Sequence, residues 1–419
     1  MLTAEENERL TRVGPGTPMG NLLRRYWHPV AGVAEMEDRW TKRVRILGED
    51  LVLFKDRGGR FGLIGEACPH RRASLAYGIP TENGIRCPYH GWMFDGRGRC
   101  IEQPNEPEGS NFKDKIATSG YPVDELGGLL WAYLGPQPAP LIPRYDGFVD
   151  APAIRHVGQA VIPCNWLQIM ENSVDAVHTE WLHGKLYEFI REKDNIKVAG
   201  AKHHLKIAFD EFPFGIIKRR MMEGQTEDCE DWKVGHPLVF PNILEVGSGG
   251  GAWKQHTFQI RVPIDDTNTQ HWWFHAYIPR EGTPVAPHLL DRVPVFDVPY
   301  LDADGEFMLQ YTHVQDIMAW ITQGPIADRT QEFLNSTDRG VTMYRALLRR
   351  ELAKVEAGED PLGTLRDPEQ NRRVALPLEK GKDMLSDGFE RMFRRHMSSF
   401  SPIAEDILAI FARQTTPVG

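Results

Sequence analysis

The alternation of apolar and polar residues predicts that the first third of the chain consists mainly of short antiparallel strands. Residues 44–65 alternate around glycine-rich turns, as half-buried strands do. Before them, residues 3–26 carry leucines at helical intervals on both sides of a Gly-Pro-Gly turn, which predicts two short helices. Residues 129–134 are predicted as a last strand. The proline-rich segment 135–140 follows and can continue neither a strand nor a helix easily, so it marks a domain boundary.

Beyond this boundary the pattern predicts a second domain of strands and helices. Strand-like alternation occurs at 202–210, 253–264 and 270–278, and helical spacing at 165–183, 314–320, 330–356 and 401–413. Because the strands tend to precede the helices, an α+β fold is expected. The predicted division is a helical segment at 1–40 that packs on the second domain, a first domain at 41–138 and a second domain at 139–419.

Composition limits the classes of partner. The chain has 419 residues, 41% hydrophobic residues and 11 tryptophans, which is more than one small module needs. A net charge of −9 argues against a nucleic-acid partner. The acidic start lacks the features of a secretory signal, and no apolar run approaches about 18 residues, so no membrane span is expected. Cys100, Cys164 and Cys229 are irregularly spaced and odd in number, so they are expected to be free thiols in a reducing cytoplasm.

Four residues in the first quarter of the chain have the spacing of a metal centre. They are Cys68, His70, Cys87 and His90, in a C-P-H sequence and, sixteen residues later, a C-P-Y-H sequence. One Cys and one His in each of two loops suit a Rieske [2Fe–2S] cluster, in which two Cys bind one iron and two His bind the other. A structural zinc site is the alternative, but zinc favours C-x2–4-C and H-x3–5-H pairs.

The residues beside these ligands indicate the type of cluster. Respiratory Rieske proteins have an extra Cys in each ligand loop, and these two Cys form a disulfide; here Tyr89 stands at one of those positions. Trp92 replaces the Ser whose hydroxyl would donate to a cluster sulfur. Fewer hydrogen bonds to the cluster imply a lower reduction potential. We therefore expect a cluster that supplies electrons to a second site in the protein.

A second candidate metal site follows residue 170. Asp175, His178 and His183 have the pattern D-x2-H-x4-H on a segment predicted to be helical. Histidines five residues apart do not share an ideal α-helical face, so a kink or a helix end must bring them together. Surface or capping histidines on an ordinary helix are the alternative explanation.

Taken together, the two motifs resemble the α subunits of Rieske non-haem iron oxygenases, in the phthalate dioxygenase-like branch. Residues 12–27, 315–320, 324–329 and 336–341 also resemble that branch. The resemblance implies that mononuclear Fe(II) is held by two histidines and one carboxylate, with positions open for O2. It assigns His178, His183 and Asp316 to this triad. Asp328 is expected to form a structural ion pair with the adjacent Arg, and His313 to be only a neighbour.

The resemblance also implies roles for two residues near the triad. Asp175 would bridge His178 to His90 of a neighbouring subunit, with a plain capping or orienting role as the alternative. Asn172 precedes Asp175 in the motif and could form a hydrogen bond near the iron.

The fold implied by the resemblance is a Rieske domain of small antiparallel sheets followed by a helix-grip catalytic domain, in which a curved antiparallel sheet wraps a long helix. In that branch α subunits alone form a homotrimer or a hexamer of stacked trimers. The chain lacks a G-x-G-x-x-G fingerprint, so a separate reductase carrying flavin, a [2Fe–2S] cluster or both is expected to supply electrons from a nicotinamide cofactor.

The expected function is that of a terminal oxygenase that uses O2 to hydroxylate or dihydroxylate an aromatic, carboxylated substrate. A monooxygenase O-demethylase of the same fold is one alternative. A Rieske electron-transfer protein with an attached binding domain is another.

Residues that would bind such a substrate are weakly indicated by the sequence. An anionic substrate needs basic groups in an apolar pocket. The candidates are Lys218, Arg219, Arg220 and Arg261, each of which could equally lie on a solvated face. Four apolar residues could line the pocket or belong to the core: Phe240, Leu244, Trp253 and Trp273. The Gly-rich run 247–251 lacks the Lys-Ser/Thr of a phosphate-binding loop, so nucleotide binding is not expected.

Overall fold

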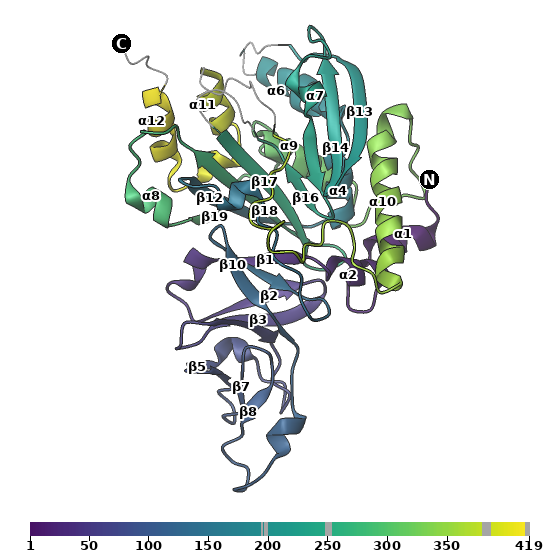
Figure 1. Cartoon of the computed structure of the whole chain (residues 1–419). Helices are drawn as coiled ribbons and strands as arrows, with labels where there is room; N and C mark the ends of the chain where they lie inside the picture. Colours follow the sequence, from purple (N-terminus) through teal and green to yellow (C-terminus); the bar gives the residue numbers. More distant parts are fainter. Residues whose placement is uncertain (194–195, 197–199, 248–253, 379–386, 415–419) are drawn as a thin grey trace.

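The computed structural model describes residues 1–193, 196, 200–247, 254–378 and 387–414. Figure 1 shows a narrow lobe of small sheets below a larger body with one long sheet and most of the helices. Of the Gly-rich run at 247–251, only Gly247 is among the described residues, and Trp253 lies outside them. The α+β fold predicted from the sequence is confirmed.

Three small sheets form the N-terminal third, as the alternation predicted. The strands of the sheet β1-β11-β10 join this third to the body, and β2-β3-β4-β9 and β5-β6-β7-β8 follow below it (Figure 1). All their pairings are antiparallel. The strands are β1 (Trp27–Gly32), β2 (Thr41–Ile46), β3 (Glu49–Lys55), β4 (Phe61–Gly65), β5 (Ile79–Thr81), β6 (Gly84–Arg86), β7 (Met93–Phe94), β8 (Cys100–Glu102), β9 (Gly120–Tyr121), β10 (Val123–Leu126) and β11 (Leu129–Tyr133).

The body contains an eight-stranded sheet in the order β13-β14-β15-β16-β17-β18-β12-β19. Its pairings are antiparallel except at one edge, where β19 runs parallel to β12. This corrects the expectation of a purely antiparallel sheet. The chain reaches that edge through the crossover 279–294, and a crossover permits parallel pairing where a tight hairpin does not. The strands are β12 (Ile154–Ile162), β13 (His204–Phe212), β14 (Gly215–Met222), β15 (His236–Val239), β16 (Ile243–Glu245), β17 (Lys254–Pro263), β18 (Thr269–Ile278) and β19 (Val295–Asp297).

Helices cover this sheet and the N-terminal segment. The described helices are α1 (Ala4–Thr11), α2 (Pro18–Leu23), α3 (Asp146–Val149), α4 (Trp166–Ser173), α5 (His178–Glu180), α6 (Leu186–Lys193), α7 (Glu230–Lys233), α8 (Pro287–Asp291), α9 (Thr312–Ile321), α10 (Arg339–Glu356), α11 (Asp387–Arg394) and α12 (Ala404–Gln414). Helix α1 contacts α4, and α2 contacts α10, so both N-terminal helices lie against the body (Figure 1). None of the described helices is long and apolar enough to cross a bilayer.

The longest helix begins later than the sequence pattern predicted. A helix was expected over 330–356, but α10 starts at Arg339. Asn335 and Asp338 form a capping box. The side chain of Asn335 accepts a hydrogen bond from the N–H of Thr337, and the side chain of Asp338 accepts one from the N–H of Asn335. These bonds compete with a continuous helix and explain the late start. From Arg339 onward, Val341, Tyr344 and Leu348 are buried at helical spacing.

The described residues form four hydrophobic cores, two of which bear on the candidate sites. The larger one includes strands of the upper small sheet, α4, α10 and the eight-stranded sheet. The smaller one lies inside the lower lobe and contains Cys68 and Cys87. Of the other cysteines, Cys100 and Cys164 are buried free thiols as expected, whereas Cys229 is only half-buried.

Candidate functional site

Two similar loops hold the first candidate metal ligands at the lower lobe. The loop after β4 carries Cys68, and the loop between β6 and β7 carries Cys87. In each loop the residue four positions after the cysteine donates its N–H to the cysteine carbonyl, Arg72 at 2.8 Å and Gly91 at 3.0 Å. Both have positive φ, 63° and 77°. At residue 91 a side chain would also collide with Pro104, so glycine is required there.

The side chains of this loop pair fit a Rieske cluster. The rings of His70 and His90 lie 4.5 Å apart between centroids, and the indole of Trp92 stacks on His70 at 4.4 Å. The buried Nδ1 of His90 has no hydrogen-bond partner, which suits a nitrogen that binds metal. Burial, together with the adjacent Cys87, raises the pKa of Cys68 to about 11. Bound iron would instead favour both thiolates.

A π-helical turn resolves the five-residue spacing of the second motif. The chain leaves α4 at Ser173, turns, and continues from His178 as α5 and then as a π-helical segment at Trp181–Lys185. A π turn bonds residues i and i+5, so it brings together side chains that an α-helix separates. The rings of His178 and His183 lie 5.3 Å apart between centroids. The sequence predicted that a kink or helix end was needed, but not that it was a π turn.

Helix α9 supplies a carboxylate to this histidine pair. The Oδ1 atom of Asp316 lies 3.2 Å from Nε2 of His183 and 3.7 Å from Nε2 of His178. One ligand atom from each of the three residues lies within 4.8 Å of the others. Asp316 Oδ1 is buried and has no hydrogen-bond partner, which is the state expected of a metal ligand. Two imidazoles and one carboxylate are the donor set that non-haem Fe(II) takes, so the residues fit that metal.

The Nε2 atoms of both rings face Asp316, and on the Nδ1 side Gln315 holds the ring of His183 by a hydrogen bond, while Asp175 lies near that of His178 without one. Nδ1 of His183 donates to Oε1 of Gln315 at 2.9 Å, and Gln315 in turn donates to a backbone carbonyl. Asp175 Oδ2 lies 3.6 Å from Nδ1 of His178, and its Oδ1 caps α5 by accepting from the N–H of Val177. The sequence indicated Asp175 but missed Gln315, although it immediately precedes Asp316.

The charges of the triad depend on one another. Burial alone would raise the pKa of Asp316, but His183, His178 and Arg261 outweigh it and hold that pKa at about 2. The contact with Asp316 in turn raises the pKa of His183, although burial acts in the opposite direction. Burial lowers the pKa of His178, and Asp175 only partly offsets this. Asp316 is therefore a carboxylate at neutral pH, ready to bind a cation.

Buried basic residues lie beside the triad. Lys218 and Arg220 on β14 and Arg261 on β17 line the cavity of about 150 Å³ that contains the triad. Burial, and then the charge of Arg220, lowers the pKa of Lys218 to about 7, and burial lowers that of Arg261 to about 9. Arg219 is the exception among the candidates. Alternate residues of a strand face opposite sides, and Arg219 pairs instead with Asp210.

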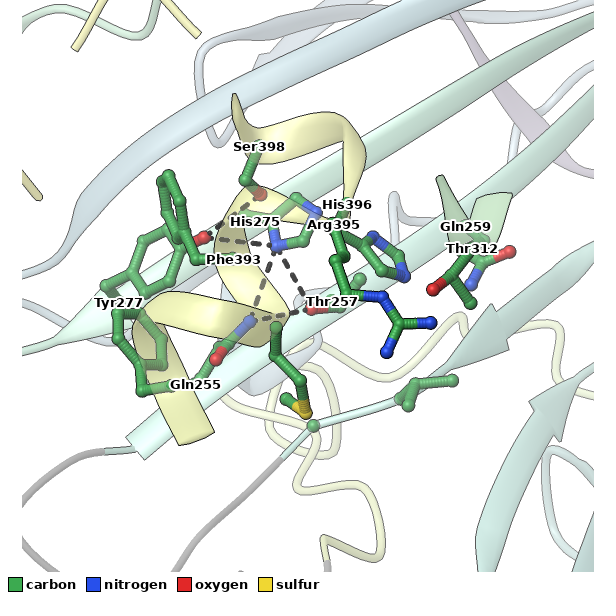
Figure 2. A pocket seen from close by; sticks show the side chains of 14 residues that line it. Gln255, Thr257, Gln259, His275, Tyr277, Thr312, Phe393, Arg395, His396 and Ser398 are labelled. Carbon is green, nitrogen blue, oxygen red and sulfur yellow. Dashed lines mark hydrogen bonds between the residues drawn. The ribbon is translucent and has the colours of Figure 1, made fainter. Parts of the chain in front are cut away.

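A second, larger cavity of about 330 Å³ adjoins the first. Both are lined by Val246, Gln259, Thr312 and His396. Figure 2 shows the larger cavity, with aromatic side chains such as Tyr277 and Phe393 at one end and Gln259 and Thr312 at the other. His396 was not predicted from the sequence, because it belongs to none of the motifs. The two cavities together offer an elongated site that begins at the triad.

The remaining sequence candidates are divided between the cavities and the core. Asn172 and Leu244 line the triad cavity. Phe240 and Trp273 are buried in two of the hydrophobic cores. His313 is buried on α9 and lines neither cavity.

The expected ion pair of Asp328 is wrong. Its carboxylate accepts hydrogen bonds from Thr330, whereas Arg329 turns inward and pairs with the buried Glu171 at 2.6 Å. Because Asp328 is exposed and Arg329 is buried, the two adjacent side chains point into different surroundings.

A further cluster of possible ligands is already neutralised. Asp146, Asp150 and His256 lie close enough to hold a cation. However, Nζ of Lys254 lies 2.8 Å from Asp150 and 3.4 Å from Asp146, and Arg373 also pairs with both carboxylates. These side chains form a structural ion-pair network.

Comparison with known families agrees with the geometry. The Rieske [2Fe-2S] domain model matches residues 26–120, and the LigXa C-terminal domain like model matches residues 303–375. The first range contains Cys68, His70, Cys87 and His90, and the second contains Asp316.

Two relatives match nearly the full length. The chain is 45% identical over 382 residues to the 5,5'-dehydrodivanillate O-demethylase oxygenase subunit of Sphingobium sp. (strain NBRC 103272 / SYK-6), covering 90% of this chain and 87% of the relative. It is 35% identical over 407 residues to the phthalate 4,5-dioxygenase oxygenase subunit of Pseudomonas putida, covering 87% and 89%.

A solved structure shares the fold. The terminal oxygenase of carbazole 1,9a-dioxygenase from Novosphingobium sp. KA1 superposes with a TM-score of 0.57 at 20% identity, over 82% of this chain and 96% of that chain. Proteins of this kind contain a Rieske [2Fe–2S] cluster and a mononuclear iron. The chain belongs to the oxygenase subunits of the Rieske non-haem iron oxygenases.

Proposed function

We propose that this oxygenase acts on an aromatic carboxylate at Fe(II) held by Nε2 of His178, Nε2 of His183 and the carboxylate of Asp316. The convergence of these atoms within 4.8 Å is the observation that carries the ligand assignment. Cys68, His70, Cys87 and His90 are the proposed cluster ligands. Bound at the triad, iron would supply the activation of O2.

The neighbours of the triad position its ligands. Gln315 accepts a hydrogen bond from Nδ1–H of His183, so the proton of that ring stays on Nδ1 and the lone pair is on Nε2. Asp175 lies 3.6 Å from Nδ1 of His178, beyond hydrogen-bond distance, so a small shift of either side chain would complete the same contact there. Partners of this kind fix both the tautomer and the orientation of a metal-binding ring. Asn172 lines the same cavity and is a candidate hydrogen-bond donor there.

The charge of the cavity supports an anionic substrate. Lys218 donates only to the carbonyl of Asp175, and Arg261 bonds Gln259 and the sulfur of Met170. Among the described residues neither forms an ion pair with a carboxylate. A buried cation without a counter-ion is costly, and a substrate carboxylate would relieve that cost. Because both residues line the cavity of the triad, the carboxylate would be held next to the iron.

Two reaction outcomes are compatible with this site. One outcome is the insertion of oxygen as ring hydroxyls, and the other is the removal of an alkyl group from an aryl ether. The relative that is 45% identical carries the name of an O-demethylase, which favours demethylation as the second candidate function. A product assay with ¹⁸O₂ over a panel of aromatic acids and their methyl ethers distinguishes the outcomes. Labelled diols indicate dioxygenation, whereas a free phenol and formaldehyde indicate demethylation. Turnover of neutral arenes but of no acid would contradict the proposal.

We infer that electrons arrive from a separate reductase and pass between subunits of a homotrimer or stacked-trimer hexamer. In support, the loops that carry His70 and His90 belong to the lower lobe, while α9 lies in the upper body (Figure 1). His70 and Tyr89 are exposed at the cluster loops. Beside His178, Trp181 and Phe189 are also exposed and line a groove. A second copy of the cluster loops could cover this groove and bring its His90 to Asp175.

Mixed oligomers test this route. Neither Cys68→Ser nor Asp316→Ala should turn over alone. When both variants are combined in one oligomer, a sound cluster faces a sound triad across an interface, so part of the activity should return. Verified mixed oligomers that stay inactive would count against transfer between subunits.

A further inference from the structure

Three polar side chains stand at the junction of the two cavities. Gln259 on β17, Thr312 at the start of α9 and His396 all line both the triad cavity and the larger cavity. We call this set the neck. Figure 2 shows Gln259 and Thr312 at the end of the larger cavity that lies away from Tyr277. A substrate that reaches from the triad into the larger cavity must pass the neck.

The hydrogen-bonding state of His396 follows from its neighbour. Nδ1 of His396 lies 2.8 Å from the sulfur of Met397. A thioether can only accept, so Nδ1 carries the ring proton and Nε2 keeps its lone pair. Burial is the main cause that lowers the pKa of His396 to about 4, so the ring is neutral near pH 7. His396 therefore offers an acceptor and no charge.

The other two members of the neck offer donors. Oε1 of Gln259 already accepts from Arg261 at 2.7 Å, which leaves the amide N–H groups of Gln259 available. The hydroxyl of Thr312 can donate or accept. The neck thus combines one acceptor with donors and has no net charge. Lys218 and Arg261 line the triad cavity and Arg395 lines the larger one, so the uncharged neck lies between basic groups on both sides.

We propose that the neck recognises a phenolic hydroxyl of the substrate, whose O–H donates to Nε2 of His396 while its oxygen accepts from Gln259 or Thr312. This inference rests on the proposed function, because it takes the substrate to be an aromatic acid bound at the triad. A carboxylate is disfavoured at the neck, since it would face the lone pair of His396. An ether oxygen could accept from Gln259, but it has no proton to give to His396. The substrate class is therefore a hydroxylated aromatic acid.

Binding measurements on the holoenzyme test this selectivity. The probes are benzoic and biphenylcarboxylic acids, each as the hydroxy acid, its methyl ether and the unsubstituted parent, titrated calorimetrically without O2 and reductant. At least one hydroxy acid should bind about tenfold or more tightly than both its ether and its parent, because a matched buried hydrogen bond is lost with either. Equal affinities throughout each series, or no binding by any acid, would overturn the inference.

Substitutions assign the selectivity to the neck. His396→Phe keeps an aromatic ring and removes the acceptor, so the hydroxyl preference should fall to within about twofold. His396→Gln restores an acceptor and should recover part of the preference, and Thr312→Val should weaken it. His288→Phe, at an exposed position on α8, is the matched control and should change nothing. A preference that survives unchanged in His396→Phe would contradict the role of the neck.

A parallel turnover assay separates this inference from the proposed function. The same acids are incubated with reductase, NADH and ¹⁸O₂. Labelled product without any hydroxyl preference in binding would sustain the oxygenation of aromatic acids and refute the neck. A hydroxyl preference that disappears in His396→Phe, with no acid oxygenated, would sustain the neck and refute the reaction.

Discussion

The two candidate metal sites differ in how their ligands are assembled. The four cluster ligands lie within one short stretch, on two loops that fold in the same way, and each loop is closed by its own backbone hydrogen bond. The three proposed triad ligands come from α5, from the π turn that follows it and from α9, which is far from both in sequence. The cluster site is thus formed by local structure, whereas the triad exists only once the body has folded.

The sites also differ in their surroundings. His70 is exposed at the lower lobe, where a partner can approach it, while the triad lies within a cavity lined by buried cations. An exposed ligand suits electron transfer, and a buried site suits chemistry that must exclude water. A change at the ligands of one site should therefore leave the metal content of the other unchanged.

The largest effect should come from Cys68→Ser. It removes a ligand that sits in the small core of the lower lobe, so the Rieske EPR signal and all turnover should be lost. Mononuclear iron should stay bound, because the triad lines a cavity in the body, outside the lower lobe. Cys100→Ser, a buried thiol of the same small core, is the matched control and should keep the signal. Turnover by cluster-free protein would break the division of roles.

Asp175→Asn should uncouple the sites while both stay loaded. The amide keeps the oxygen that caps α5 but removes the charge beside His178. Re-oxidation of the reduced cluster by substrate and O2 should slow by about 10- to 100-fold, the usual cost of losing such a partner. Stopped-flow absorbance measures this rate. Asp175→Glu keeps the charge and should retain more of the rate than the amide. An unchanged rate in the amide variant would restrict Asp175 to capping.

Gln315→Leu should weaken the triad alone. Without its acceptor, His183 can move its proton to Nε2 and lose the lone pair that faces Asp316. Affinity of the iron-depleted triad for Co(II), followed by its visible spectrum, should fall about tenfold or more. The cluster spectrum should not change. Gln315→Glu retains the acceptor and should bind Co(II) at least as well as the native protein. Equal affinity in all three proteins would contradict this role of Gln315.

The small sheet β1-β11-β10, which joins the N-terminal third to the body, carries an acid-sensitive histidine. Burial lowers the pKa of His28 to about 4, from about 6.5 when unfolded. The unfolded chain therefore binds more protons between these values, and stability present above pH 6.5 is lost as the pH falls toward 4. The loss amounts to about 3 kcal/mol for this residue. Denaturant unfolding across this range should show a shallower pH dependence in His28→Gln. An identical slope would exclude His28 as a contributor.

The sequence predicted local features well and spatial ones less well. Cysteine and histidine spacing was enough for the cluster loops, because their geometry depends on neighbouring residues. The pairing of His178 with His183 required a π turn, which the pattern of residues does not reveal. Asp316 was assigned by resemblance only, and Gln315 and His396 were missed, because their roles arise from tertiary contacts.

Two errors arose from side-chain interactions that helical periodicity and sequence adjacency do not reveal. The helix expected over 330–356 ignored the capping box at Asn335, a side-chain interaction that overrides helical periodicity. The ion pair assigned to Asp328 assumed that adjacent charges meet, but Arg329 finds a buried partner, Glu171, from a distant helix. A local capping interaction decided the first case, and a contact between distant segments decided the second.

The most direct test of two distinct metal sites is a count of iron and acid-labile sulfide per chain. Native protein should contain three irons and two sulfides, since a [2Fe–2S] cluster accounts for two of each. Asp316→Ala should contain two irons and two sulfides, with an unchanged Rieske spectrum, and Asp328→Ala should match the native count. Two irons in the native protein, or three in Asp316→Ala with two in Asp328→Ala, would contradict the assignment of the triad.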